Sequence, residues 1–218
     1  MLQIKKDISL DNTNIPFAVI KVSFPSEESW DKAAFSHLVA EEINTLKEKY
    51  ADYDRKAVWG ENPYYRFFKK FKKTYPVMLQ FESVVLKDRP FPAFNPVAEV
   101  AFLLEITTFV LSGAHDMDNI DGYVTLYLAD KKEDFVGLRE TLHTYPNDFC
   151  AKDNSGIIFS EIAGTDLRTS AKAESRNVLY PLFAVPDMDV AVIRNAAETL
   201  ERYIKTLCPD SKTEFMFI

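Results

Sequence analysis

The helical and strand patterns of this sequence are grouped rather than alternating, and that order restricts the folds open to the chain. An alternating, β-branched run over Ile15–Val22 predicts a strand, and helical patterns follow over residues 26–50, 62–73 and 97–110. After Asp121-Gly122 the pattern changes to short strands at 123–128, 149–151, 156–160 and 178–183, and a helix over 190–207 follows. A parallel sheet would need alternating βαβ units, so this order predicts an α+β fold. We expect one domain over residues 1–218, because no repeat or linker is visible.

Capping residues mark the ends of the predicted helices. Ser26 is expected to cap the first helix with its hydroxyl oxygen. Asn62-Pro63 predicts the start of the second, since a proline in the first turn loses no hydrogen bond. Pro76 is expected to end that helix, and Pro209 to end the last one.

Several classes of protein are disfavoured by what the sequence lacks. The longest apolar run, Val100–Leu111, is interrupted by Glu105 and is shorter than the ~18–20 residues of a membrane span. The first residues do not form a signal-peptide pattern, and Cys150 and Cys208 are too few for a disulfide framework, so we expect a cytoplasmic protein. There is no phosphate-binding glycine loop, dinucleotide motif, nucleophile elbow or Cys-x-x-Cys pair, and we expect no cofactor and no bound metal.

Positive charge is concentrated in one segment of an otherwise acidic chain. The net charge is −7, which argues against a general nucleic-acid binder. Residues 55–89 nevertheless hold nine basic and three acidic residues, a local charge of +6. Candidate phosphate contacts in this segment are Arg66, Lys69, Lys70, Lys72 and Lys73. The alternative is an amphipathic helix whose aromatic residues are buried and whose lysines are only solvated.

A histidine and several carboxylates are crowded into the connection after the third helix. In Gly113-Ala114-His115-Asp116-Met117-Asp118 a carboxylate next to His115 would set its tautomer and raise its pKa. The alternative is that these aspartates cap turns. A metal site at His115, Asp116 and Asp118 is a weaker interpretation, because the ligands lack a fixed spacing.

A second polar cluster follows the strand at 156–160. Gly164 allows a tight turn, Asp166 and Arg168 carry opposite charges, and Thr169 adds a hydroxyl, so the cluster could bind an oxygen-rich ligand. The alternative is an Asp–Arg surface pair of small energetic value. Glu105 lies in an apolar helix, either on its exposed side or facing a cavity.

The order of these motifs resembles a known family. It is similar to the tRNA-binding and editing domain formed by the third and fourth modules of the phenylalanyl-tRNA synthetase beta chain, and closer still to stand-alone proteins built from that domain. The resemblance covers residues 62–185. The matching runs are Phe94-Asn95-Pro96-Val97-Ala98-Glu99-Val100, Gly113-Ala114-His115-Asp116-Met117-Asp118 with Gly122, Asp148-Phe149-Cys150-Ala151-Lys152-Asp153, Gly156-Ile157-Ile158, Arg168-Thr169 and Arg176-Asn177-Val178-Leu179.

The resemblance implies a mixed α/β sandwich, with flanking N- and C-terminal helices, whose cleft hydrolyses mischarged aminoacyl-tRNA. The family's editing histidine falls on Gly113 and its editing glutamate on Pro181, so the synthetase's own mechanism does not carry over. The stand-alone group's "H-D-x-D" and "G-x-D-x-R-T" runs match His115 and Gly164 with the residues that follow each.

The resemblance implies a stand-alone module for tRNA binding or aminoacyl-tRNA editing without synthetase activity, and the residues leave catalysis open. His115 paired with Asp116 would be the general base, and Arg168 with the backbone near Gly164 would stabilise the oxyanion. The expected substrate-binding residues are Glu105, Asp118, Gly164, Asp166, Arg168 and Thr169. The main alternative is a non-catalytic domain that binds a small amino-acid-like ligand, and a third is a domain used only for protein contacts. We expect tRNA as partner, no membrane contact and no obligate partner chain.

Overall fold

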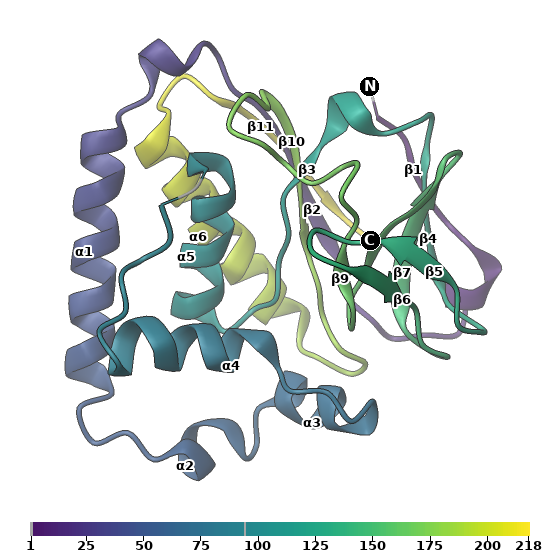
Figure 1. Ribbon diagram of the computed structural model, residues 1–218, viewed down its shortest axis with the longest axis horizontal. Coiled ribbons are helices and arrows are strands. Elements are labelled where there is room, and N and C mark those ends of the chain that lie inside the picture. The colour runs from purple at the N-terminus through teal and green to yellow at the C-terminus, as the bar shows by residue number, and fades with distance from the viewer. Residues whose placement is uncertain (1, 94) are drawn as a thin grey trace.

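The computed structural model describes residues 2–93 and 95–218 and shows an α+β fold in three layers (Figure 1). Helices form the first layer, a four-stranded sheet the second, and a five-stranded sheet the third. The four-stranded sheet has the order β11 (Lys212–Phe217), β2 (Ala18–Ser23), β10 (Asn177–Leu182), β3 (His115–Asp116). The five-stranded sheet has the order β1 (Ile4–Lys6), β4 (Val124–Leu128), β7 (Phe149–Asp153), β8 (Gly156–Ser160), β9 (Gly164–Thr165).

The four-stranded sheet is built on strand β2, which is buried over Ala18–Val22. It pairs antiparallel with β10 on one side and β11 on the other. Its one charged residue, Lys21, is buried and forms an ion pair of 3.0 Å with Glu214 of β11. The buried amine is therefore neutralised across the sheet, as buried charges require.

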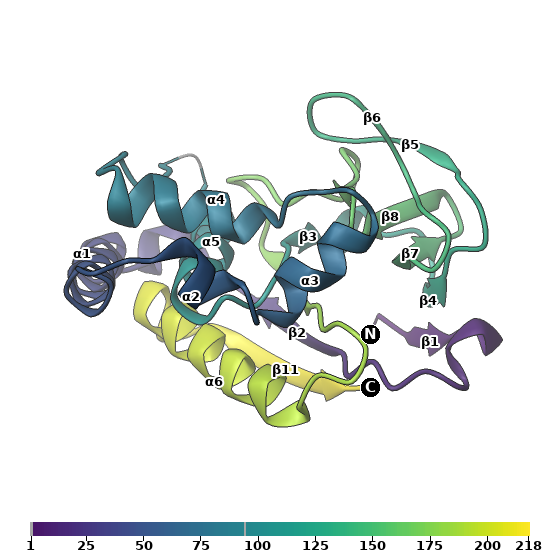
Figure 2. The same ribbon diagram turned by 90° about the horizontal axis from the view of Figure 1, so that it is seen from below.

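The helical layer covers this sheet through α6 (Val190–Leu207), which contacts β2, β10, α1 (Lys32–Lys49) and α5 (Pro96–Thr108). Figure 2 shows α6 running along the sheet, and the hairpin of β5 (Asp134–Val136) and β6 (Thr141–His143) projecting from the strand region. The shorter helices α2 (Arg55–Trp59), α3 (Pro63–Lys70) and α4 (Pro76–Phe81) lie between α1 and the strands. None of the helices in the described part of the chain is both long and apolar enough to cross a membrane.

Several predicted elements are confirmed. Helix α6 has the predicted bounds. Asn62 caps α3 by accepting a hydrogen bond from the Tyr65 backbone N–H at 3.0 Å, with Pro63 in the first turn. The strand predicted at 156–160 is β8. These elements could be predicted because periodicity and caps are local properties of the sequence.

Three local predictions are wrong. Ser26 makes no capping hydrogen bond and precedes a short 3₁₀ turn, whereas Asp31 caps α1 through the Ala34 N–H at 2.8 Å. Helix α3 ends at Lys70 rather than near Pro76, because the chain enters the left-handed region at Lys72 (φ 57°). Pro76 instead begins α4, where its fixed φ suits the first helical position.

Aromatic side chains attach α3 to the rest of the fold. Tyr64, Phe67 and Phe68 are buried, which confirms that the aromatic residues of this segment are core residues. The Tyr64 ring stacks on Tyr75 with centroids 5.1 Å apart, and its hydroxyl donates a hydrogen bond to the Phe183 carbonyl. The position of α3 relative to the end of β10 is therefore set by buried contacts.

Candidate functional site

Two adjacent cavities lie where the helical layer meets the strands. Cavity A, of about 270 Å³, lies between the α3–α4 connection and the β8–β9 turn. Cavity B, of about 310 Å³, lies beside α5 and the segment 112–114. Ser112 and Thr165 line both cavities, so the two are neighbours. Their volumes are near the lower end of ordinary ligand pockets, roughly 300–1,000 Å³.

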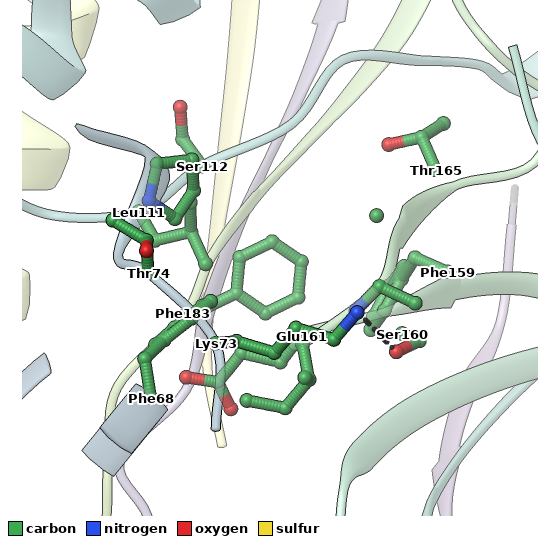
Figure 3. Close-up of a pocket in the computed structure, with 14 residues that line it drawn as sticks. Phe68, Lys73, Thr74, Leu111, Ser112, Phe159, Ser160, Glu161, Thr165 and Phe183 are labelled. Carbon is green, nitrogen blue, oxygen red and sulfur yellow. Dashed lines mark hydrogen bonds between the residues drawn. The ribbon is translucent and has the colours of Figure 1, made fainter. Parts of the chain in front are cut away.

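Cavity A has apolar walls and few polar groups (Figure 3). Its polar lining includes Lys73, Ser112 and Glu161. Its apolar lining includes Phe68, Leu111, Phe159, Ile162 and Phe183. A pocket of this kind favours an apolar ligand that carries a small number of polar groups.

Glu161 is the most unusual residue of cavity A. The residue is 3% exposed, and neither carboxyl oxygen has a hydrogen-bond partner within the described part of the chain. Burial, together with the nearby Asp148 carboxyl, raises the pKa of Glu161 well above its usual range. Burial therefore favours the protonated, neutral form of this side chain.

The turn that carries Glu161 is held by Asp148. This buried carboxylate accepts hydrogen bonds from the Ser160 hydroxyl and, at 3.2 Å, from the Ile162 backbone N–H. The Ser160 oxygen in turn accepts from the Ala163 N–H at 2.8 Å. Burial raises the pKa of Asp148 to about 6. The backbone on both sides of Glu161 is thus fixed by bonds that do not involve its own carboxyl group.

Cavity B contains a second buried carboxyl group, that of Glu105. Its Oε1 accepts hydrogen bonds from the Ser112 backbone N–H at 2.9 Å and from the Ser112 hydroxyl at 3.3 Å. Burial raises the pKa of Glu105 to about 7. A carboxyl with a pKa near neutrality can act as a general base at physiological pH. Of the two positions considered for Glu105, the structure shows the one facing a cavity.

His115 is completely buried, and its bonds differ from those expected. Its Nδ1 lies 2.8 Å from the Thr169 hydroxyl oxygen. Because that hydroxyl donates its proton to Asp166, Nδ1 must be the protonated nitrogen and Nε2 an acceptor. Nε2 has no partner among the residues described, and burial lowers the pKa of His115 to about 3.

Asp116 does not pair with His115 as the sequence predicted. Its carboxylate accepts hydrogen bonds from the Asp118 N–H at 3.0 Å and from the Ser175 hydroxyl at 2.6 Å. The two residues are consecutive in β3, so their side chains point to opposite faces of the sheet. Asp118 accepts from the Asn177 amide. Asp116 thus caps the short 3₁₀ turn that follows β3, and the catalytic role of His115 with Asp116 stays a prediction that their contacts do not favour.

Arg168 is held away from the expected oxyanion site. Its guanidinium makes two hydrogen bonds of 2.9 Å to the carboxylate of Asp153 and one of 2.6 Å to the Asn119 carbonyl. Its Nε lies 3.8 Å from Asp166. Gly164 does line cavity A, with a φ of +116° that suits glycine. Of the predicted substrate-binding residues that the structure describes, Glu105 and Gly164 line the two cavities, whereas Asp118, Asp166, Arg168 and Thr169 do not.

The basic residues of the segment 66–73 are exposed, three of them on α3 and two in the connection that follows it. All five predicted phosphate contacts are solvent-exposed: Arg66, Lys69, Lys70, Lys72 and Lys73. Arg66 forms an ion pair with Glu61, and the Lys69 amine lies 4.2 Å from the centroid of the Tyr65 ring. Lys73 is both the last member of this set and a lining residue of cavity A. The basic surface therefore reaches the cavity.

The sequence did not predict the roles of Glu161 and Ser112 in the cavities. It also did not predict that Lys73 belongs both to the basic surface and to the lining of cavity A. The available signal for Glu161 was a single acidic residue at the end of a strand, in the run Ile157–Ile162 whose other residues are apolar except Ser160. No group of three or more potential metal-ligating side chains comes together in the residues that the structure describes.

Comparison with known proteins supports the fold. The sequence matches no protein-family model. It also matches no curated protein. Among solved structures, the fold is similar to that of an N-terminal fragment of the phenylalanyl-tRNA synthetase beta-subunit from Pyrococcus horikoshii, with a TM-score of 0.50 and 11% sequence identity. The similarity covers 97% of this chain and 50% of that chain. This chain thus spans about half of that fragment, and the likeness extends beyond residues 62–185.

The first prediction concerns the stability cost of Glu161. Glu161→Met replaces the unpartnered carboxyl with an apolar group of similar length, so we expect the free energy of unfolding at pH 7 to rise by about 1–3 kcal/mol. Urea denaturation measures this change. Glu174→Met, at an exposed position, is the control and should change stability by less than about 0.5 kcal/mol. A loss of stability in Glu161→Met would mean that the carboxyl is partnered in solution.

The second prediction concerns the buried neutral His115. Its pKa is lowered from 6.5 to about 3, so the unfolded chain binds the extra proton as the pH falls below 6.5 and native stability decreases. The variant His115→Asn keeps a donor for Thr169 but cannot titrate. The stability difference between wild type and variant should therefore shift against the wild type by about 2 kcal/mol between pH 7.5 and pH 5. Urea titrations at both pH values measure it, and a constant difference would contradict the burial of a neutral imidazole.

Proposed function

We propose that this chain binds tRNA and hydrolyses an aminoacyl ester at its end, with the aminoacyl group in cavity A. The observation that carries the proposal is the position of Lys73, which belongs to the exposed basic set and also lines the cavity. A phosphate backbone lying along the basic side of α3 would bring its terminal group to the mouth of cavity A. The similarity in fold to a subunit of a tRNA synthetase supports the same assignment.

The chemistry of ester hydrolysis matches the carboxyl group of Glu105. The carboxylate would remove a proton from a water molecule, whose oxygen forms a bond to the ester carbonyl carbon. The ester C–O bond then breaks, the amino acid leaves with a carboxyl group, and the ribose oxygen takes up the proton. Ser112 hydrogen-bonds Glu105 and lies at the junction of the cavities, so an ester there would be next to the base.

A second function, non-catalytic binding of a small amino-acid-like ligand, is favoured by the overall charge of −7 and the small size of cavity A. The two functions differ in a single observable. A binding domain would take up the free ligand and leave charged tRNA intact, whereas an editing module would release the amino acid from it.

The third prediction tests the basic surface. Changing Lys69, Lys70, Lys72 and Lys73 together to Gln should weaken tRNA binding. It should also reduce the slope of log affinity against log salt by roughly 0.7–0.9 for each phosphate group that the variant no longer neutralises. Filter binding at several salt concentrations measures both quantities. The control changes Lys5, Lys6, Lys131 and Lys132, which are also exposed but lie in β1 and after β4, to Gln. Equal effects in both variants would mean that the lysines of the basic segment contribute to tRNA binding only through the overall charge of the protein.

The fourth prediction tests the base. Glu105→Gln should lower the rate of deacylation of misacylated tRNA at least 100-fold and leave tRNA affinity unchanged, because general bases contribute roughly 10²–10⁴-fold. In the wild type the rate should rise with pH through about 7, as Glu105 loses its proton. His115→Asn is the comparison and should keep most activity. If His115→Asn loses activity and Glu105→Gln keeps it, Glu105 is not the general base and His115 is.

A further inference from the structure

Glu161 is a buried acid for which the protein itself supplies no partner. Both carboxyl oxygens are shielded and unbonded within residues 2–93 and 95–218, although the residue lines cavity A. The titratable groups whose charges act on it or are acted on by it are Asp148, Cys150, Tyr64 and Tyr75. None of these four carries a positive charge at neutral pH.

The positively charged residue that lines the same cavity, Lys73, also leaves Glu161 unpaired. Lys73 lines the same cavity, but its amine lies over the ring of Tyr145, 5.4 Å from the centroid, and makes no ion pair with Glu161 in the described structure. Asp148 uses its carboxylate to hold the turn around Glu161. A buried acid in this state is costly, and such groups persist where a ligand supplies the missing bonds.

We propose that Glu161 binds the amino group of the ligand in cavity A, so that the cavity selects α-amino compounds with an apolar side chain over the same compounds without the amino group. This inference rests on the proposed function, which places an aminoacyl group in that cavity. An ammonium group offers up to three donors and a positive charge, which match two unbonded carboxyl oxygens. The walls formed by Phe68, Phe159 and Phe183 would contact the apolar side chain.

A single cation of this kind fits better than a metal ion. Metal ions need several oxygen, nitrogen or sulfur ligands, and Glu161 is the one carboxylate among the residues described as lining cavity A. An ammonium group needs one carboxylate and tolerates apolar neighbours when the charge is paired.

Proton release should accompany binding. Burial and the nearby Asp148 carboxyl raise the pKa of Glu161 and so favour its protonated form in the empty site, whereas a bound ammonium favours the carboxylate. An α-amino group with a pKa of about 8 enters already charged at pH 6.5, so the proton that leaves comes from the protein. Proton release on binding therefore indicates that a protonated carboxyl group, that of Glu161, loses its proton when it pairs with the amine.

The experiment uses two probes that differ in one group, leucinamide and 4-methylpentanamide, with the chain of residues 1–218 at pH 6.5. We expect the wild type to bind leucinamide at least tenfold more tightly than 4-methylpentanamide. Titration calorimetry in two buffers of different ionisation enthalpy should show a net release of protons with leucinamide. In Glu161→Gln both the preference and the proton release should be lost, and affinity for 4-methylpentanamide should stay within threefold of the wild-type value.

Two further variants keep the outcome interpretable. Glu161→Met, expected to be more stable than the wild type, should lose the preference in the same way, which separates recognition from folding. Glu174→Gln, at an exposed position, should keep both the preference and the proton release. If Glu161→Gln keeps the preference while the wild type binds tRNA, this inference is wrong and the proposed function stands. If the wild type binds neither tRNA nor leucinamide, both fail.

Discussion

The burial of the aromatic face of α3 determines where both parts of the proposed site lie. Tyr64, Phe67 and Phe68 are removed from water, and burying a side chain of this size contributes about 1.5–3 kcal/mol. Lys69 and Lys70 of the same helix are exposed to solvent, and the connection after the helix places Lys73 at cavity A. A change that loosened this packing would move the cavity wall and the basic surface together, because Phe68 belongs to the wall.

Buried acids are the second constraint on this protein. Burial raises the pKa of Glu105, Asp148 and Glu161, and each has a different relation to its surroundings. Asp148 holds a turn, and Glu105 is bonded to Ser112 at the junction of the cavities. Glu161 has no partner in the described residues. Glu161 is therefore the acid to which a ligand can supply the missing hydrogen bonds. The stability that its buried carboxyl costs is expected for a residue kept for binding.

Local properties of the sequence predicted much of the fold, whereas contacts between residues far apart in the chain could not be predicted from it. The bounds of α6 and the cap at Asn62 follow from periodicity and neighbouring residues, and the structure confirms them. Strand β11 was missed because its pairing with β2 joins residues far apart in the chain. Pro76 was misread because a proline can end one helix or begin the next, and only the path of the chain at Lys72 decides.

The candidate site shows the same limit. Adjacency in sequence suggested that His115 and Asp116 form a pair, but in a strand adjacent side chains point apart. Arg168 was expected near Gly164, yet it binds Asp153 from another strand. The importance of Glu161 depends on burial and on the absence of a partner among the described residues, and neither property can be read from residue order.

The position of the aminoacyl group in cavity A is tested most directly by a crystal structure with an adenosine that carries leucine through a non-hydrolysable 3′ amide. We expect the leucyl side chain among the apolar walls of cavity A, its amino nitrogen within hydrogen-bond distance of Glu161, and the amide carbonyl near Ser112. A leucyl group bound outside both cavities, with Glu161 still unbonded, would contradict this expectation.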